Sequence, residues 1–221
     1  PIESVRLVHY GEQVRFDDVR VTSWNSGHIL GSSLYEIATP EGTVVYTGDL
    51  NCSEGFTTQP ACVMSCAVLV IEATFGSPSF VFPSRRALSF QMVSWAQRCL
   101  ERGRLPVLRS DHVGNAQEIT SAFNLLSNLP VVSDPRVAKV TRAYEAHGHR
   151  LEHMSASSNE GGRLLAQRRC VFVTPKSVEL PSSLNAEVAL ASGWATLVGG
   201  SRPGFALSDH SDFPHLLEYV R

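Results

Sequence analysis

The chain has 221 residues, of which 43% are hydrophobic and 18% are charged, and its formal net charge is -2. This length excludes a peptide or a disulfide-stapled mini-domain and predicts one large domain or two small ones with a buried core. The small net charge excludes a protein that holds nucleic acid through bulk positive charge alone, but it is compatible with a local basic groove. Because no apolar run approaches the roughly 20 residues of a membrane span and no signal-peptide pattern is seen, we expect a cytoplasmic protein without a membrane partner.

The cysteines also indicate a reducing compartment. They are odd in number and contain no CxxC pair, so a disulfide framework is not expected. Cys62 and Cys66 are spaced as CxxxC, but a four-cysteine zinc site needs a second pair, which the sequence lacks. The five are Cys52, Cys62, Cys66, Cys99 and Cys170.

Short strands are predicted over the first 75 residues, which are rich in Val, Ile, Thr and Tyr. The first strand is expected within residues 5–12. Residues 35–49 predict a β-hairpin, because alternating apolar residues flank the turn sequence Pro40-Glu41-Gly42. Residues 67–73 form a continuous apolar run, which predicts a strand buried on both faces.

Helices alternate with strands in the middle of the chain. A helix is predicted from the capping residue Ser84 to Gly103, with apolar residues at helical spacing on one face. Two more helices are predicted at residues 114–129 and 135–149, with short strands before each of them. Such a β-α-β-α order predicts a small parallel sheet. Strands are then expected at residues 168–175, 186–194 and 205–210, followed by a short helix that begins at Asp212 and Pro214.

Three polar clusters lie where predicted strands end, which is where sheet enzymes commonly place catalytic groups. The first is His28, flanked by two glycines, and it could equally be a turn histidine. The second is Asp49 in a Gly-Asp pair, which also suits a turn cap. The third spans residues 207–212 and contains His210 between aspartates, a pattern suited to a divalent cation. Its alternative is a helix N-cap at Asp212 beside a surface histidine.

Glu72 ends the most hydrophobic predicted strand. A buried carboxylate without a partner would cost several kcal/mol, so we expect Glu72 to meet an imidazole, an arginine or a backbone donor. A carboxylate that orients a metal-bound histidine is one such arrangement. The alternative is a carboxylate that is simply exposed at the strand end.

In chain order these motifs resemble the metallo-β-lactamase-fold nucleases of the β-CASP group, which include polyadenylation-factor endonucleases, RNA-processing relatives and bacterial ligase-associated DNA exonucleases. The resemblance rests on GHILGS, YTGDLN, VIEATFGSP and the SGW…FALSDHSDF run, and it covers essentially the whole chain. It implies an α/β fold in which a partial αββα sandwich carries an inserted β-CASP domain. The expected boundaries are 1–76 for the first sandwich part, 77–170 for the insertion and 171–221 for the return to the sandwich.

The resemblance also implies roles for individual residues. His28, Asp49 and His210 match metal-binding positions, and Asp49, Glu72 and His210 match positions that serve catalysis. The implied cofactor is zinc, with two ions in a complete site. Arg85, Arg109 and Arg202 are candidate contacts to the phosphates of RNA or single-stranded DNA, with solvated surface residues as the alternative.

Two features of the family pattern are absent from the sequence. The His-x-His-x-Asp-His signature, which supplies four ligands, is not found, and His9 is the only histidine before His28. The middle β-CASP histidine has no clear match, although His147, His149 and His153 are nearby candidates. We therefore expect a chain that lacks the N-terminal part of the family's fold and an incomplete metal site.

The resemblance predicts hydrolysis of phosphodiester bonds in RNA, as in mRNA 3'-end processing, or at DNA ends. One alternative is a non-catalytic β-CASP-like subunit that binds nucleic acid or forms an oligomer with an active homologue. The retained His28, Asp49, Glu72 and His210 argue against that alternative. A hydrolase of small substrates is a third reading, which the large helical insertion disfavours.

Overall fold

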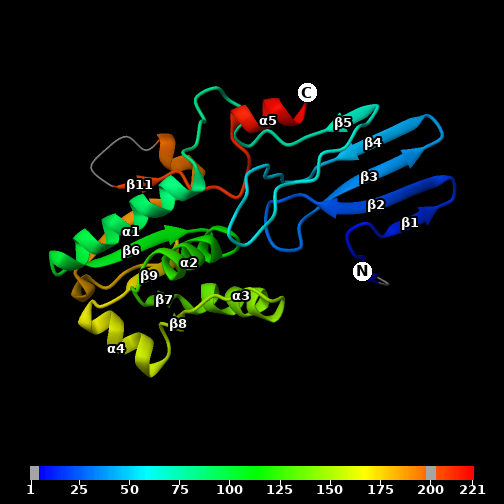
Figure 1. Ribbon diagram of the computed structural model, residues 1–221. Helices are drawn as coiled ribbons and strands as arrows, with labels where there is room; N and C mark the ends of the chain where they lie inside the picture. The colour runs from blue at the N-terminus through cyan, green and yellow to red at the C-terminus, as the bar shows by residue number, and fades with distance from the viewer. Residues whose placement is uncertain (1–4, 198–202) are drawn as a thin grey trace. The chain divides into compact units, whose positions relative to one another are not determined.

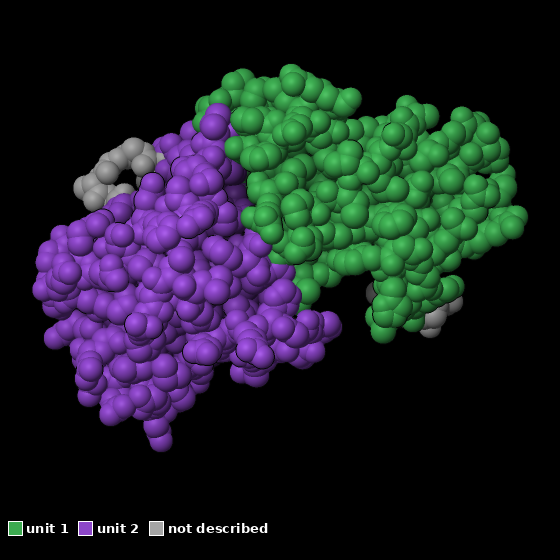
Figure 2. Space-filling model, viewed as in Figure 1, with its two compact units in different colours: residues 1–54, 58–79, 209–221 green, residues 55–57, 80–208 purple. Residues whose placement is uncertain are grey.

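The computed structural model describes residues 5–197 and 203–221 and is a mixed α/β structure (Figure 1). The chain divides into two compact units (Figure 2). Unit 1 comprises residues 1–54, 58–79 and 209–221, and unit 2 comprises residues 55–57 and 80–208. Among the described residues, no helix has both the length and the apolar character needed to cross a membrane.

Unit 1 is built on a five-stranded sheet in the order β1-β2-β3-β4-β5. Strands β1 to β4 are antiparallel neighbours, and β5 runs parallel to β4. The predicted hairpin is confirmed, since β3 and β4 pair across the turn that joins Thr39 to Gly42. The predicted strand at residues 5–12 is wrong, because the first strand begins at Gln13. The elements are β1 (Gln13–Phe16), β2 (Val19–Asn25), β3 (Ser33–Thr39), β4 (Gly42–Tyr46), β5 (Val68–Val70) and the helix α5 (Phe213–Tyr219).

The two faces of this sheet differ in burial. One face packs into a core that contains Leu34, Val45 and Leu216. On the other face, paired residues form one β-branched row across all five strands: Val14, Val21, Ile37, Val44 and Val68.

The prediction that residues 67–73 are buried on both faces is wrong. Strand β5 lies at the edge of the sheet, and Val68 and Val70 are 53% and 46% exposed. A continuous apolar run is typical of a two-faced buried strand, but it does not reveal whether both faces are covered.

Unit 2 contains a six-stranded sheet in which every pairing is parallel, in the order β11-β10-β6-β9-β7-β8. The three predicted helices are confirmed. Ser84 caps the first by accepting from the Ala87 amide, and Asp134 caps the third by accepting from the Arg136 amide. The elements are α1 (Arg85–Glu101), β6 (Leu105–Ser110), α2 (Asn115–Leu126), β7 (Val131–Ser133), α3 (Pro135–Ala146), β8 (Met154–Ser155), α4 (Asn159–Gln167), β9 (Val171–Pro175), η1 (Ser182–Leu184), β10 (Ala186–Ala191), η2 (Gly193–Leu197) and β11 (Gly204–Phe205).

Both faces of the unit 2 sheet are covered. Val107 and Phe172 point into one hydrophobic cluster, which also contains Leu164 of α4. Their neighbours Leu108 and Val173 point into the other, which also contains residues of α1, α2 and α3. Consecutive strand residues alternate between the two clusters, as a sheet with helices on both faces requires.

The boundary between the units differs from the one expected from the sequence. Residues after 170 were expected to return to the first layer, whereas the structure places β9, β10 and β11 in the sheet of unit 2 and resumes unit 1 at residue 209. Strand β9 lies between β6 and β7, so it is a central strand of that sheet. Strand-rich composition identifies a strand but not the sheet in which it pairs.

Candidate metal centre

Gly27 brings His28 close to the loop that carries Asp49. The residue has φ +73°, which favours glycine, and it forms an isolated bridge with Leu50. A Cβ at this position would lie 2.1 Å from the Asn51 carbonyl oxygen. The Asn51 amide also donates to the Ser26 carbonyl. This close backbone approach therefore requires glycine at position 27.

The segment that carries His210 is bonded to the same loop. The Ser211 amide donates to the Leu50 carbonyl at 2.8 Å, and the Ser211 hydroxyl accepts from the Cys52 amide at 2.9 Å. Three stretches of unit 1 that are distant in sequence thus meet at the ends of the sheet strands.

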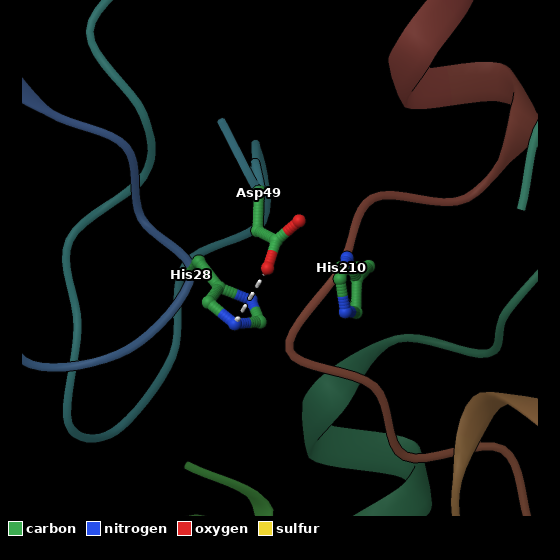
Figure 3. A group of neighbouring side chains, drawn as sticks. All are labelled: His28, Asp49 and His210. Atoms are coloured by element: carbon green, nitrogen blue, oxygen red, sulfur yellow. Dashed lines mark ion pairs between the residues drawn. The ribbon is translucent and has the colours of Figure 1, made fainter. Parts of the chain in front are cut away.

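His28, Asp49 and His210 come together in unit 1 (Figure 3). One potential ligand atom from each lies within 4.8 Å of the other two. The Nε2 atom of His28 is 3.6 Å from Oδ2 of Asp49, and the two imidazole rings are centred 4.5 Å apart. The His28 and His210 side chains are 14% and 20% exposed, whereas Asp49 is 61% exposed. The group is therefore open to solvent on the carboxylate side.

Both histidines are oriented through their Nδ1 atoms. His28 Nδ1 lies 2.9 Å from the Asp209 carbonyl oxygen, which can only accept, so Nδ1 donates and the neutral ring would leave the lone pair on Nε2. His210 Nδ1 lies 2.9 Å and 3.0 Å from the two carboxylate oxygens of Glu72. An acceptor on the second ring nitrogen is the common way in which proteins orient a metal-binding histidine.

Glu72 is a buried carboxylate with partners, as the sequence predicts. Its side chain is 8% exposed and accepts from His210 and from the Leu50 and Thr74 amides. Burial opposes ionisation of Glu72, but these hydrogen bonds, led by that of His210, outweigh it and hold its pKa below the ordinary value. Burial likewise disfavours charge on His210, yet the Glu72 carboxylate outweighs it and raises the pKa of that imidazole.

The donor set of this group fits a divalent cation. Two imidazole nitrogens and one carboxylate oxygen are ligands that zinc and other borderline cations accept. Each imidazole has a hydrogen-bond acceptor on its Nδ1 atom, and Asp49 supplies negative charge from a separate loop.

Asp209 belongs to the third polar cluster of the sequence, but the contact made by its backbone carbonyl was not predicted. Its carbonyl orients His28, and its own carboxylate Oδ1 lies 3.9 Å from His210 Nε2. The Asp-His-x-Asp pattern was a signal for two carboxylates, and the structure separates their environments. Asp212 caps helix α5 by accepting from the His215 amide, so the N-cap interpretation is confirmed for Asp212, while His210 is not a surface histidine.

The predicted nucleic-acid contacts have different surroundings. Arg85 is 14% exposed, lies 3.6 Å from Glu118 and donates to the Ser208 carbonyl, so its guanidinium is engaged by acceptors of the protein. Arg109 donates to the Val178 carbonyl at 2.7 Å. Arg202 lies outside the described residues. The exposed Arg86, whose guanidinium lies 5.8 Å from the Phe90 ring centre, is more accessible than Arg85.

The candidates for a middle β-CASP histidine all belong to unit 2. His147 is exposed and bonds through Nδ1 to the Ala143 carbonyl of its own helix. His149 packs against Tyr144, and the His153 side chain is 8% exposed with Nε2 3.9 Å from Glu145.

Comparisons with known proteins give distant but consistent relatives. The chain is 28% identical over 215 residues to a probable DNA ligase of Opitutus terrae, which covers 92% of the chain and 20% of the relative. It is 28% identical to an RNase J-like protein of Methanocaldococcus jannaschii, covering 66% of the chain and 37% of that protein. It is 32% identical to the transcription termination factor FttA of a Lokiarchaeum species, covering 59% of the chain and 22% of that protein. No protein-family profile matches the sequence.

A solved structure shares the fold. A protein of unknown function from Enterococcus faecalis superposes with a TM-score of 0.61 over 98% of the chain and 59% of its own length, at 14% identity. The chain spans between a fifth and about two fifths of the length of the three relatives above.

Proposed function

We propose that the chain is related to the metallo-β-lactamase-fold β-CASP nucleases that its motifs resemble, and that it acts as a metal-dependent nuclease on phosphodiester bonds of RNA. Two of the three relatives described above carry names that refer to RNA cleavage or transcription termination, which favours RNA over DNA ends. The relative named as a DNA ligase keeps DNA as the second substrate class.

The observation that carries this proposal is the convergence of His28, Asp49 and His210, with both imidazoles oriented by acceptors of the same unit. A histidine and an aspartate in turns have no structural need to meet a third side chain from the opposite end of the chain. The Glu72–His210 pair also places charge in a buried position. Burying charge costs free energy unless the charge is paired or the arrangement has a function.

The metal bound here is proposed to be zinc, with two ions in a complete site. Zinc, when bound, supplies Lewis-acid activation of water and stabilises the charge that develops on the phosphate in hydrolysis. Three residues offer too few ligands for two ions, so a complete site needs donors beyond His28, Asp49 and His210.

Each protein side chain then has a definable task. Glu72 accepts from Nδ1 of His210 and fixes the ring so that Nε2 faces the site. Nε2 of His210 can hold a cation or pass a proton to the leaving oxygen, according to its protonation state. The Asp209 carbonyl performs the orienting role for His28, and Asp49 contributes a carboxylate oxygen from the opposite loop.

We further propose that unit 1 is part of an αββα sandwich and that unit 2 is the β-CASP insertion. The apolar row on the outer face of the unit 1 sheet supports the sandwich, because antiparallel sheets that face water normally carry polar residues on that face. A second sheet packed at about 10 Å would remove this row from solvent.

The test is a cleavage assay on labelled single-stranded RNA and DNA with added Zn²⁺, comparing the wild type with His210→Ala and Asp49→Asn. We expect RNA cleavage that falls by about 10²-fold or more in both variants, the size of effect that a catalytic side chain produces. Cleavage that survives both substitutions would contradict the proposed site. RNA binding without any cleavage would instead support the non-catalytic subunit.

A further inference from the structure

Glu118 of helix α2 is a buried carboxylate whose hydrogen-bond donors come from a loop of the protein. Its side chain is 5% exposed. Oε1 accepts from the Thr57 amide at 2.7 Å and from the Thr57 hydroxyl, and Oε2 accepts from the Phe56 amide at 3.1 Å. These residues belong to Gly55–Thr57, the short stretch in which the chain leaves unit 1, joins unit 2 and returns.

Arg85, near the start of helix α1, completes the cluster. Its Nε atom lies 3.6 Å from Oε2 of Glu118, and its terminal NH2 group donates to the Ser208 carbonyl at 2.9 Å. Ser208 is the last residue of unit 2 before the chain re-enters unit 1. The Arg85–Glu118 pair therefore holds two segments at the points where the chain changes units.

These two segments lead directly to the metal centre. Ser208 is followed by Asp209, whose carbonyl orients His28, and then by His210. Gly55–Thr57 follows the loop that carries Asp49, and within that loop the Asn51 side chain accepts from the Ser53 amide. The Asp49 loop and the Asp209–His210 stretch are therefore joined through the backbone to the two segments that Arg85 and Glu118 hold, and His28 is linked to the second of them through the Asp209 carbonyl.

We propose that Arg85 and Glu118 are positioning residues for the metal centre, which act by fixing the ends of the Asp49 and His210 segments. The inference rests on the proposed metal site. A positioning role would account for this buried ion pair. Stability alone does not account for it well, because the cost of removing both charges from water offsets their attraction. It also assigns Arg85 a role other than contact with nucleic acid.

The variants for the test are Glu118→Gln, which keeps the shape of the side chain, and Arg85→Met, which keeps much of its apolar stem. The matched control is Glu187→Gln in the same unit, where Glu187 pairs with Arg102 at 3.0 Å and 3.1 Å. Glu187 also lies 3.8 Å from Arg104, so both of its arginine partners follow helix α1 and lie outside the two segments.

The first readout is amide hydrogen exchange of the metal-free chain, followed in peptides that cover residues 49–58 and 205–212. We expect faster exchange in both peptides in Glu118→Gln and in Arg85→Met, and wild-type exchange in Glu187→Gln. The second readout is Zn²⁺ affinity by calorimetric titration. We expect a loss of about 10- to 100-fold in both variants, the effect of removing groups that position metal ligands.

The two readouts separate the positioning role from the proposed function. Unchanged exchange in both peptides would overturn the positioning role, whether or not the chain binds zinc. Faster exchange with wild-type zinc affinity would also overturn it, because the pair would then stabilise the segments without serving the site. A wild-type chain that binds no Zn²⁺ would overturn the proposed metal site, and with it the link between the pair and metal binding.

Discussion

The two units differ in how completely their sheets are covered. In unit 2 the parallel sheet has a hydrophobic cluster on each face, and its central strand β9 is buried along its whole length. In unit 1 one face of the sheet packs into a small core, and the other face is open to solvent. On the open face Tyr35 is 38% exposed, and Tyr46, Val68 and Val70 are more exposed than that. Most of the exposed large hydrophobic side chains among the described residues lie in unit 1.

The larger hydrophobic core and the candidate site residues therefore lie in different units. Unit 2 has the larger core, whereas the chemically distinctive residues His28, Asp49, Glu72 and His210 lie in unit 1. The unit with the smaller core therefore carries the candidate site, and backbone hydrogen bonds and the conformation of Gly27 hold the segments of that site together. Substitutions in each unit test that contrast.

The largest effect is expected in the core of unit 2. Phe123 is fully buried in the cluster formed with α1 and α3, so Phe123→Ala should lower the free energy of unfolding by about 3–5 kcal/mol. The control is Leu125→Ala on the same helix, where the side chain is 64% exposed and the change should stay within about 0.5 kcal/mol. Equal losses in urea unfolding would show that α2 does not bury the face described here.

Gly27→Ala should disrupt the proposed metal centre of unit 1. The added Cβ would lie 2.1 Å from the Asn51 carbonyl oxygen. The positive φ would cost a further free energy of about 1–3 kcal/mol for a residue other than glycine. We expect lost zinc binding in titration and a lower melting temperature. Gly31→Ala is the matched control, since Gly31 has φ +82° but a Cβ there meets nothing within 4 Å. If Gly31→Ala abolished binding equally, the close approach at Gly27 would not be the cause.

The helices and strands of unit 2 could largely be predicted from the sequence. The residue range over which they form one unit could not. Caps at Ser84 and Asp134 and the spacing of apolar residues determine where helices begin, and these signals are local. Which sheet β9 and β10 join depends on pairing with β6, more than 60 residues earlier in the chain, and no local pattern reports that.

The residues of the candidate site could also be predicted only in part from the sequence. His28, Asp49 and His210 could be singled out because polar residues flanked by glycine or aspartate follow apolar strands. The orienting carbonyl of Asp209 and the Glu118 cluster could not, because a backbone acceptor and a buried helix carboxylate have no sequence signature. Arg85 has the residue type of a phosphate contact, and its buried position beside Glu118 could not be read from the sequence.

A smaller effect is expected on the outer face of the unit 1 sheet. Val68 is 53% exposed, so Val68→Thr should change the free energy of unfolding of this chain by no more than about 0.5 kcal/mol. It should also reduce binding of a hydrophobic dye. Val45→Thr on the neighbouring strand buries a hydroxyl in the core and should cost about 1–3 kcal/mol. A large loss in Val68→Thr would mean that this face is already covered.

The smallest effect concerns pH and His153 of unit 2. Burial lowers the pKa of this imidazole, and it outweighs the nearby Glu145, which acts in the opposite direction. The unfolded chain therefore takes up the proton first, so the stability contributed by neutral His153 is present above the ordinary pKa and is lost as pH falls below it. We expect a decrease in melting temperature between pH 7.5 and pH 5 that is smaller in His153→Leu. The exposed His147→Gln serves as the control, and a wild-type slope in His153→Leu would contradict the assignment.

The central claim is that His28, Asp49 and His210 form a metal-binding group, and zinc titration followed by zinc X-ray absorption tests it most directly. We predict saturable Zn²⁺ binding to the purified chain, nitrogen and oxygen ligands around the ion, and lost or strongly weakened binding in His28→Ala, Asp49→Asn and His210→Ala. Zinc held by sulfur, binding that survives all three substitutions, or no binding to the wild-type chain would contradict the account.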